Sequence, residues 1–508
     1  MNRRTFVKSV SMAGASVIAS HGVPTVAQNS TESQPLNIQI WTDTELRKLP
    51  HAWEECVGSD RAIVATRAQW LSDLELVKKT TGVKSVRFHG LFNDEMGVWS
   101  AGPQPNFLYV DTVFDAMLDR GIKPFVELSF MPAHLASGNK TIFWYRGNTT
   151  PPGNMAQWGE LVGALGKHCV DRYGINEVAS WNFEVWNEPN IGFWSGTKAE
   201  YMELYRQSAT ALKGVDRRLR VGGPSTAQAA WVGDLLAYCA DQQVPIDFAS
   251  SHIYPDDPQK VVFGEGVHHP FEEVIPKSLE KMQAEIAGSK RPHTPLYITE
   301  WSSQNPAFIA HTIKSTIGLA DILSYWTFDN VFEELGVPRT FLNNNFGLLG
   351  MRGVPRPSYH AFTLLHKLGN AELKSDSTSV LATRRNDGSV AILAWNLIPK
   401  TPGQQSGMGN PLVQSGDQYG ASGQALDLRI SLQGHHSYRS ARVTRVDAKH
   451  GNVRRAYEEI GSPQYPTREQ IEEMKQRAAL PAPEQVAIRS QALSVSIPPN
   501  GIALLELT

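Results

Sequence analysis

The sequence predicts an α/β protein: a (β/α)8 TIM barrel followed by a C-terminal β-sandwich domain. Between residues 50 and 360, eight short apolar runs alternate with amphipathic helical patterns, which is typical of parallel strands joined by helices. After Leu368 the helical pattern becomes scarce, and short strand-like runs with polar interruptions replace it. A chain of 508 residues also fits one large and one smaller domain. A doubly wound open sheet with an irregular insertion is the alternative for the first part.

The eight strand-like runs are apolar, and loop-type residues follow each of them. They span residues 54–58, 85–89, 124–128, 183–186, 220–223, 248–251, 296–299 and 323–326. Helical periodicity follows most of them, for example over residues 111–120, 158–172 and 198–213. Thr197 and Glu200 have the spacing of a capping box, which predicts the start of the last of these helices.

The sequence after Leu368 predicts short strands and one helix. The strand-like runs span residues 380–383, 390–395, 428–432, 442–447 and 492–497. Thr467 and Gln470 suggest a second capping box, at the start of a helix over residues 467–479. A stretch rich in Gly, Ser and Gln over residues 401–423 predicts a long mobile loop.

The N-terminus predicts an export signal. Arg3 and Arg4 precede a weakly apolar run over residues 9–20, and Thr-Val-Ala at 25–27 offers a small-residue cleavage site. This pattern is typical of a twin-arginine signal, so we expect a bacterial protein exported to the periplasm or secreted; a frayed basic terminus is the alternative. The expected organisation is a signal peptide at 1–27, a lead-in segment at 28–50, the barrel at 51–368 and the sandwich at 369–508.

Composition and motif searches exclude several classes of function. A formal net charge of -2 argues against nucleic-acid binding, and after signal removal no run reaches the length of a membrane span. The three cysteines cannot all pair, so we expect them in the core rather than in a disulfide framework. No Walker or Rossmann motif is present, and the His pairs at 268–269 and 435–436 lack metal-ligand spacing. The sequence therefore predicts no cofactor and no metal.

Polar side chains follow the predicted barrel strands at their carboxyl ends, where barrel enzymes place their active sites. Glu55, His89 and Glu127 follow the first three strands, Asn-Glu-Pro at 187–189 follows the fourth, and Thr-Glu-Trp at 299–301 follows the seventh. An isolated glutamate there is more often a solvated loop charge. Two carboxyl groups at opposite strand ends are what glycoside hydrolysis needs, one to protonate the leaving oxygen and one to act at the anomeric carbon.

Several stretches resemble glycoside hydrolase family 39, which contains bacterial β-xylosidases and α-L-iduronidases. The longest is Trp-Asn-Phe-Glu-Val-Trp-Asn-Glu-Pro-Asn at 181–190, which is similar to the family's acid/base strand. The resemblance runs from about Trp53 to the C-terminus. Its other stretches are residues 86–90, 123–127, 143–148, 251–255, 298–301, 325–328, 332–334 and 461–463.

The resemblance implies a retaining exo-glycoside hydrolase that acts by double displacement. It assigns Glu188 as the catalytic acid/base and Glu300 as the nucleophile, with Asn187 forming a hydrogen bond to the sugar 2-hydroxyl. Tyr254 would orient Glu300, while His252 would reach a sugar hydroxyl. Glu334 and Glu333 would accept hydrogen bonds from outer sugar hydroxyls. Trp326 would stack on the ring; His89, Glu127 and Tyr145 would line the pocket or support it from behind.

The expected partner is an oligosaccharide or glycoside, and the sugar is inferred from charge. No lysine or arginine occurs between Ser251 and Lys260, which favours a neutral sugar such as xylose over iduronate. We therefore expect a β-xylosidase that acts on xylo-oligosaccharides. Asn-Asn-Asn at 343–345 departs from the family's His- and Gly-containing loop, so an arabinosidase, galactosidase, glucosidase or iduronidase-like enzyme stays open. Two alternatives to a retaining glycosidase are a non-catalytic carbohydrate-binding barrel and an inverting enzyme. The sequence predicts no oligomeric state.

Overall fold

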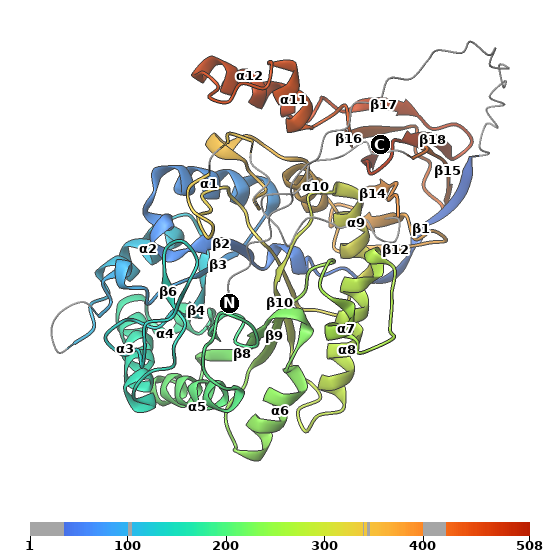
Figure 1. Ribbon diagram of the computed structural model, residues 1–508. Coiled ribbons are helices and arrows are strands. Elements are labelled where there is room, and N and C mark those ends of the chain that lie inside the picture. Colours follow the sequence, from blue (N-terminus) through green and yellow to red (C-terminus); the bar gives the residue numbers. More distant parts are fainter. Residues whose placement is uncertain (1–34, 100–103, 339, 343–345, 400–422) are drawn as a thin grey trace, which may run out of the picture. The chain divides into compact units, whose positions relative to one another are not determined.

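A closed barrel of eight parallel strands forms the first domain (Figure 1). The computed structural model describes residues 35–99, 104–338, 340–342, 346–399 and 423–508. The barrel strands, in their order around it, are β10 (Leu296–Trp301), β11 (Ile322–Tyr325), β2 (Val57–Arg61), β3 (Ser85–His89), β4 (Lys123–Leu128), β7 (Asn182–Val185), β8 (Arg220–Thr226) and β9 (Phe248–His252). The predicted barrel is thus confirmed over the open sheet.

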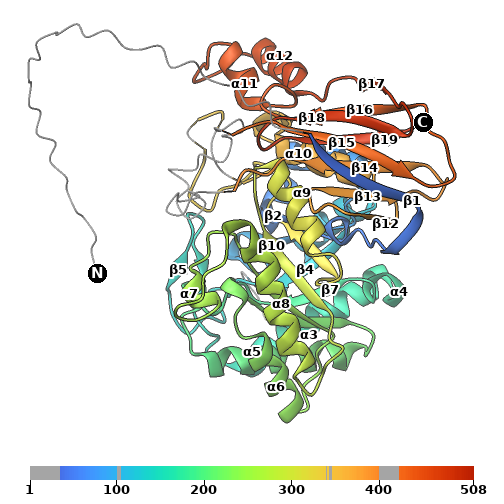
Figure 2. The same cartoon turned by 90° about the vertical axis from the view of Figure 1, so that its right-hand side faces the viewer.

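Helices connect the strands on the outside of the barrel, as Figure 2 shows for α5, α6 and α8. They are α1 (Ala68–Thr81), α2 (Leu108–Leu118), α3 (Met155–Tyr173), α4 (Ile175–Val178), α5 (Lys198–Val215), α6 (Val232–Asp241), α7 (Gln259–Val262), α8 (Val274–Ala287), α9 (Pro306–Ser315) and α10 (Pro357–His366). Helix α5 begins with the predicted capping box: the Glu200 amide donates to Thr197 Oγ1 at 3.2 Å, and the Thr197 amide donates to Glu200 Oε2 at 2.7 Å.

The first barrel strand lies three residues later than predicted, at Val57–Arg61. The predicted start is occupied by the short 3-10 helix η1 (Ala52–Glu54), in which Glu54 Oε1 contacts the His51 and His366 imidazoles at 2.6 and 3.0 Å. Glu55 consequently precedes the strand and pairs with Lys84 at 2.5 Å. Glu55 therefore lies at the amino end of the strand, away from the carboxyl ends where a barrel site forms.

Short elements lie in the loops at the carboxyl ends of the strands. The hairpin of β5 (Thr141–Ile142) and β6 (Gly147–Asn148) lies between β4 and α3. The remaining 3-10 helices are η2 (Ala62–Thr66), η3 (Asp94–Met96), η4 (Ala227–Ala229), η5 (Phe271–Glu273) and η6 (Met351–Gly353).

A nine-stranded sheet forms the second domain and fits the predicted sandwich. Its order is β17 (Glu484–Ala487), β16 (Ser440–Val446), β19 (Ile502–Leu507), β14 (Val390–Trp395), β13 (Val380–Arg384), β12 (Ala371–Ser375), β1 (Leu36–Lys48), β15 (Leu426–Gln433) and β18 (Ala492–Ile497). Apolar side chains from β1, β14, β15 and β19 form one buried cluster. Two helices, α11 (Val453–Glu459) and α12 (Arg468–Ala478), complete the domain, and α12 begins with the predicted Thr467–Gln470 capping box.

Strand β1 comes from the segment that we expected to be a lead-in. It pairs in parallel with β15 and antiparallel with β12, so the chain contributes to this sheet before it enters the barrel. Its alternating burial, with Ile38 and Ile40 inside, is that of a strand with one buried face.

Helices α9 and α10 of the barrel domain pack against the nine-stranded sheet (Figure 2). Helix α9 contacts β14 and β19, and α10 contacts β16. The Asn305 side-chain amide at the start of α9 donates to Asn500 Oδ1 at 3.0 Å. Trp301 and Phe362 on the barrel side and Trp395 and Leu504 on the sheet side belong to one buried cluster.

The three cysteines are free and buried, as expected for core residues. In the described parts of the chain, no helix has the length and apolar character to cross a bilayer. The expected signal peptide at 1–27, the Asn-Asn-Asn loop at 343–345 and all but the last residue of the predicted loop at 401–423 lie outside the described residues.

Candidate active site

The guanidinium of Arg87 lies at the centre of the carboxyl ends of the barrel strands. Arg87 is on β3 and is fully buried, and a buried cation needs partners on every side. Its partners, with the distances from its nitrogens, are Glu184 Oε2 (2.6 Å), Glu300 Oε1 (2.8 Å), Glu127 Oε2 (2.8 Å), Asn187 Oδ1 (2.9 Å) and Ser225 Oγ (3.1 Å). One side chain therefore positions residues from β4, β7, β8 and β10.

Glu300 is held on both of its carboxylate oxygens. Arg87 Nη1 donates to Oε1 at 2.8 Å, and the Tyr254 hydroxyl donates to Oε2 at 2.9 Å. The pKa of Glu300 is raised above its ordinary value, because burial outweighs the opposing effects of Arg87, His89 and the Tyr254 hydroxyl. These three groups favour the carboxylate, which is the form that a nucleophile needs.

Glu188 follows β7 in a left-handed backbone conformation, with φ of 43°, and its carboxyl is buried. Glu188 Oε1 lies 2.9 Å from His252 Nδ1, and no arginine or lysine pairs with it among the described residues. Burial raises the pKa of Glu188 well above its ordinary value, and the charge of Glu300 raises it further. When the two carboxyls hold a single proton, the proton therefore resides on Glu188.

The separation of the two carboxyls matters for the stereochemistry. Glu188, His252 and Glu300 each place one atom within 4.8 Å of the others. Carboxyl groups of inverting glycosidases lie about 6.5–9.5 Å apart, because a water molecule must fit beside the sugar, whereas those of retaining enzymes lie about 5–5.5 Å apart. The short separation fits direct attack by one of the carboxylates.

Both ring nitrogens of His252 contact protein groups. They lie 2.9 Å from Glu188 Oε1 and 3.3 Å from Ser225 Oγ, and the expected contact with a sugar hydroxyl stays a prediction. Burial lowers the pKa of His252 well below its ordinary value, and the charge of Arg87 adds to the effect. A neutral imidazole between protein partners holds the Glu188 carboxyl in place.

The surroundings of His89 raise its pKa, whereas those of His252 lower the pKa of that residue. His89 Nδ1 lies 2.8 Å from Glu127 Oε2, and Nε2 lies 3.5 Å from Glu334 Oε1. Burial lowers the pKa of His89, but Glu127 and Glu334 outweigh burial and raise it well above the ordinary value. The imidazolium thus links Glu127, which Arg87 also binds, to Glu334 at the outer side of the pocket. Burial raises the pKa of Glu334 to about 7.

Trp326 forms an aromatic wall beside this cluster. Its ring centroid lies 4.7 Å from that of His89. The indole lies directly on Gly58 of β2, where an added Cβ would come within 2.2 Å of Trp326 Cε3. A glycine at position 58 is therefore required for this wall, which suits sugar stacking.

Glu333 and Tyr145 both lie beside Arg61. Arg67 and Arg61 occupy both oxygens of Glu333, at 2.6 Å from Oε1 and 3.0 Å from Oε2. Both oxygens of Glu333 thus accept from arginines, whereas Glu334 faces His89; the expected role of Glu333 toward a sugar hydroxyl stays a prediction. Arg61 also lies over the Tyr145 ring, 4.5 Å from its centroid.

Three residues that hold the site together were absent from the predicted set: Arg87, Glu184 and Ser225. Glu184 accepts hydrogen bonds from Arg87 and, at 2.9 Å, from Thr299 Oγ1. A signal for the first two was present in the sequence, because an arginine and a glutamate interrupt strands that are otherwise apolar. Charges inside such strands require each other as partners.

Among the described residues, the group that could ligate a metal ion is Glu188, His252 and Glu300. Arg87 already donates to Glu300 and places a positive charge beside the position that a cation would take. Acid–base and nucleophilic chemistry suits these three groups better.

Comparison with known proteins agrees with this geometry. The family model described as "Glycosyl hydrolases family 39" matches residues 36–492. A β-xylosidase of Geobacillus stearothermophilus is 34% identical over 492 residues, covering 91% of this chain and 93% of that protein. A β-xylosidase of Caldicellulosiruptor saccharolyticus is 36% identical over 467 residues, covering 86% and 91%. The crystal structure of a monomeric β-xylosidase from Caulobacter crescentus CB15 superimposes with a TM-score of 0.82 at 29% identity, covering 93% and 99%. The chain is therefore a glycosyl hydrolase and belongs to glycosyl hydrolases family 39.

Proposed function

We propose that the protein is an exo-acting β-xylosidase that releases xylose from xylo-oligosaccharides with retention of configuration. The observation that carries the proposal is the pair Glu188 and Glu300, whose carboxyls lie close together. Arg87 and Tyr254 donate to Glu300, whereas no arginine or lysine among the described residues pairs with Glu188. The two β-xylosidases that cover most of this chain support the choice of sugar.

In the first step, Glu300 attacks the anomeric carbon while Glu188 gives its proton to the glycosidic oxygen. The bond to the leaving group breaks and a glycosyl–enzyme ester forms. In the second step, Glu188 takes a proton from water, the water attacks the same carbon and the ester bond to Glu300 breaks. Two inversions yield net retention.

Asn187 is expected to assist both steps. Its Oδ1 already accepts from Arg87 at 2.9 Å, so the side-chain NH2 is left to donate to the substrate. Hydrogen bonds to the sugar 2-hydroxyl strengthen in the transition state.

The charge balance of the site favours a neutral sugar. Arg87 is surrounded by carboxylates, and Arg61 is bound by Asp60, Glu95 and Glu333. Neither cation is left to neutralise the carboxylate of an iduronate. A panel of nitrophenyl glycosides (β-xyloside, arabinosides, galactoside, glucoside and iduronide) tests this, with the highest kcat/KM expected on the β-xyloside. A higher value on any other sugar would reject the proposal.

Activity should fall on the alkaline side as Glu188 loses its proton. Because its pKa is raised, Glu188 stays protonated well above the pH at which a free glutamate ionises. With xylobiose, kcat/KM should be constant between the pKa values of Glu300 and Glu188, decrease as pH rises through the pKa of Glu188, and decrease as pH falls through that of Glu300. A nitrophenyl xyloside needs little leaving-group protonation, so its alkaline decrease should be shallower. Identical alkaline limbs for the two substrates would contradict the acid role of Glu188.

We also propose export by the twin-arginine route, which rests on Arg3, Arg4 and the mild apolar run that follows. In a bacterial host, the full chain should accumulate in the periplasm, and a variant carrying Arg3→Lys and Arg4→Lys should remain in the cytosol. Equal periplasmic amounts of both would reject this route.

A further inference from the structure

The end of β9 and the loop after it contact both catalytic glutamates. His252 ends the strand and contacts Glu188, and the Tyr254 hydroxyl donates to Glu300 Oε2 at 2.9 Å. Between them, the Ile253 amide donates to the backbone oxygen of Glu300 at 3.2 Å. The conformation of this short segment therefore determines where the partners of both carboxyls lie.

A β-turn over residues 254–257 ends this segment. The Asp257 amide donates to the Tyr254 carbonyl oxygen at 3.1 Å, which is the hydrogen bond that defines such a turn. Pro255 occupies the second position, where its restricted φ is favourable. The Asp257 side chain closes the turn a second time, because its Oδ2 accepts from the Tyr254 amide at 2.8 Å.

The Tyr254 amide has this carboxylate as its partner. Strand β9 ends at His252, so the ladder of the barrel does not extend to residue 254. A backbone N–H that loses its partner in a partly buried segment destabilises the conformation that contains it. Asp257 thus stabilises the backbone of Tyr254 in the conformation in which the Tyr254 hydroxyl binds Glu300.

Asp257 also brings a negative charge to the site. Burial raises the pKa of its carboxyl to about 7, and in the described part of the chain no lysine or arginine forms an ion pair with it. The neighbouring Asp256 raises the pKa of Asp257 as well. The charged residues with the largest effects on the pKa of Glu188 come from four different segments: Glu300 from β10, Asp257 from the loop after β9, His89 from β3 and Glu334 from the loop after β11.

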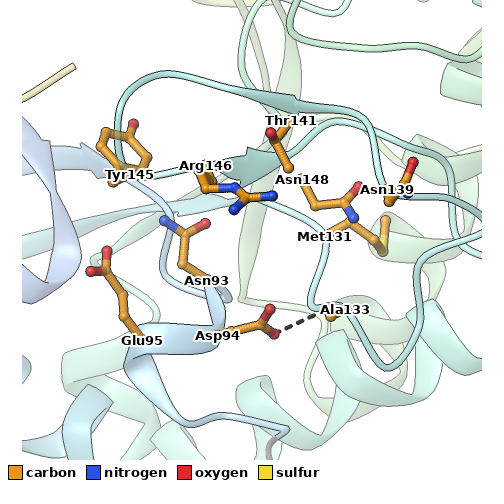
Figure 3. Close-up of a pocket in the computed structure, with 10 residues that line it drawn as sticks. All are labelled: Asn93, Asp94, Glu95, Met131, Ala133, Asn139, Thr141, Tyr145, Arg146 and Asn148. Carbon is orange, nitrogen blue, oxygen red and sulfur yellow. Dashed lines mark hydrogen bonds between the residues drawn. The ribbon is translucent and has the colours of Figure 1, made fainter. Parts of the chain in front are cut away.

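Charged residues also surround a cavity of about 350 Å³ between η3 and the β5–β6 hairpin, where Figure 3 shows Asp94, Glu95 and Arg146. They follow β3 and β4, and β3 lies across the barrel from β9. None of the three is among the charges that act most on Glu188. Among those charges, Asp257 is the one without a role in the site so far.

We propose that Asp257 is a positioning residue for catalysis. Its carboxylate closes the turn that directs the Tyr254 hydroxyl to Glu300, and its negative charge acts on Glu188. An ionised Asp257 disfavours a second negative charge on Glu188 and so helps to keep the proton there. This proposal rests on the proposed function, in which Glu188 is the acid/base and Glu300 the nucleophile.

Replacing Asp257 with asparagine separates the charge from the turn, because the introduced amide oxygen can still accept from the Tyr254 amide. The alkaline limb of kcat/KM for xylobiose should move to lower pH by about half a pH unit, since Glu188 then loses its proton more readily. Nitrophenyl β-xyloside should show a smaller change, because its leaving group needs little protonation. Asp256→Asn removes the same charge one residue earlier and is the matched control, with no change of the limb expected. An unchanged limb in Asp257→Asn would overturn the proposal.

Replacing Asp257 with alanine tests the turn itself. Measured below the alkaline limb, Asp257→Ala should lower kcat on nitrophenyl β-xyloside about tenfold, whereas Asp257→Asn should stay within about twofold of the unaltered enzyme. In a Tyr254→Phe background no hydroxyl remains to be positioned, so adding Asp257→Ala should cost less than about twofold. Equal losses in the two backgrounds would refute the positioning role. Turnover of nitrophenyl β-xyloside by the unaltered enzyme tests the proposed function alone, so the two failures are distinguishable.

Discussion

Replacing Glu300 with glycine is expected to reduce turnover of every xyloside by about 10⁴-fold or more, because no other group can form the glycosyl–enzyme bond. Arg87 and the Tyr254 hydroxyl both donate to this carboxylate, and burial raises the pKa of the other nearby carboxyl, Glu188. Steady-state rates on nitrophenyl β-xyloside measure the loss. Circular dichroism of the same preparation would show that the fold is kept.

Azide distinguishes the nucleophile from other essential groups. The glycine leaves a space beside the anomeric carbon from which a small anion can attack. Added azide should restore turnover of the Glu300→Gly variant, and NMR should identify the product as the α-xylosyl azide, inverted once. A β-xylosyl azide would mean that Glu300 is not the nucleophile.

The barrel was predictable from the sequence because its strands are short, apolar and regularly spaced between amphipathic helices. The first strand was shifted because η1 places Glu54 in a buried contact with His51 and His366, and His366 lies far along the chain. Strand β1 was missed for a related reason. It is separated by more than 300 residues from its partners β12 and β15, and pairing over such a distance leaves no local pattern.

Within the site, residue types were easier to predict than contacts. The motifs around Glu188 and Glu300 place two carboxyls at strand ends, and the structure brings them together. His252 and Glu333 find their partners on other elements: Ser225 lies in β8, Arg61 ends β2 and Arg67 precedes α1. Glu333 and Glu334 are adjacent residues of the same type, so the sequence does not distinguish them. In the structure Glu333 binds two arginines, whereas Glu334 faces His89.

Replacing Glu188 with alanine should affect substrates according to their leaving groups. Xylobiose should lose about 10³–10⁴-fold in kcat/KM, because its leaving sugar must be protonated, whereas nitrophenyl β-xyloside should lose far less. Water activation in the second step also depends on Glu188, so the glycosyl–enzyme should accumulate and produce an initial burst of nitrophenol. Rapid-mixing kinetics on both substrates check these expectations, and Glu160→Ala, an exposed glutamate on α3, is the control.

The two glutamate variants together separate the roles more sharply than either does alone. In the Glu188→Ala variant Glu300 still forms the ester on the opposite face, so azide should intercept that ester and give the β-xylosyl azide. The same anion therefore produces opposite anomers in the two variants, because it replaces water in one and the nucleophile in the other. Equal losses on xylobiose and nitrophenyl β-xyloside, or an α-azide from Glu188→Ala, would contradict the acid/base role. His252, which is neutral and bonded to Glu188, offers no second proton donor to obscure the result.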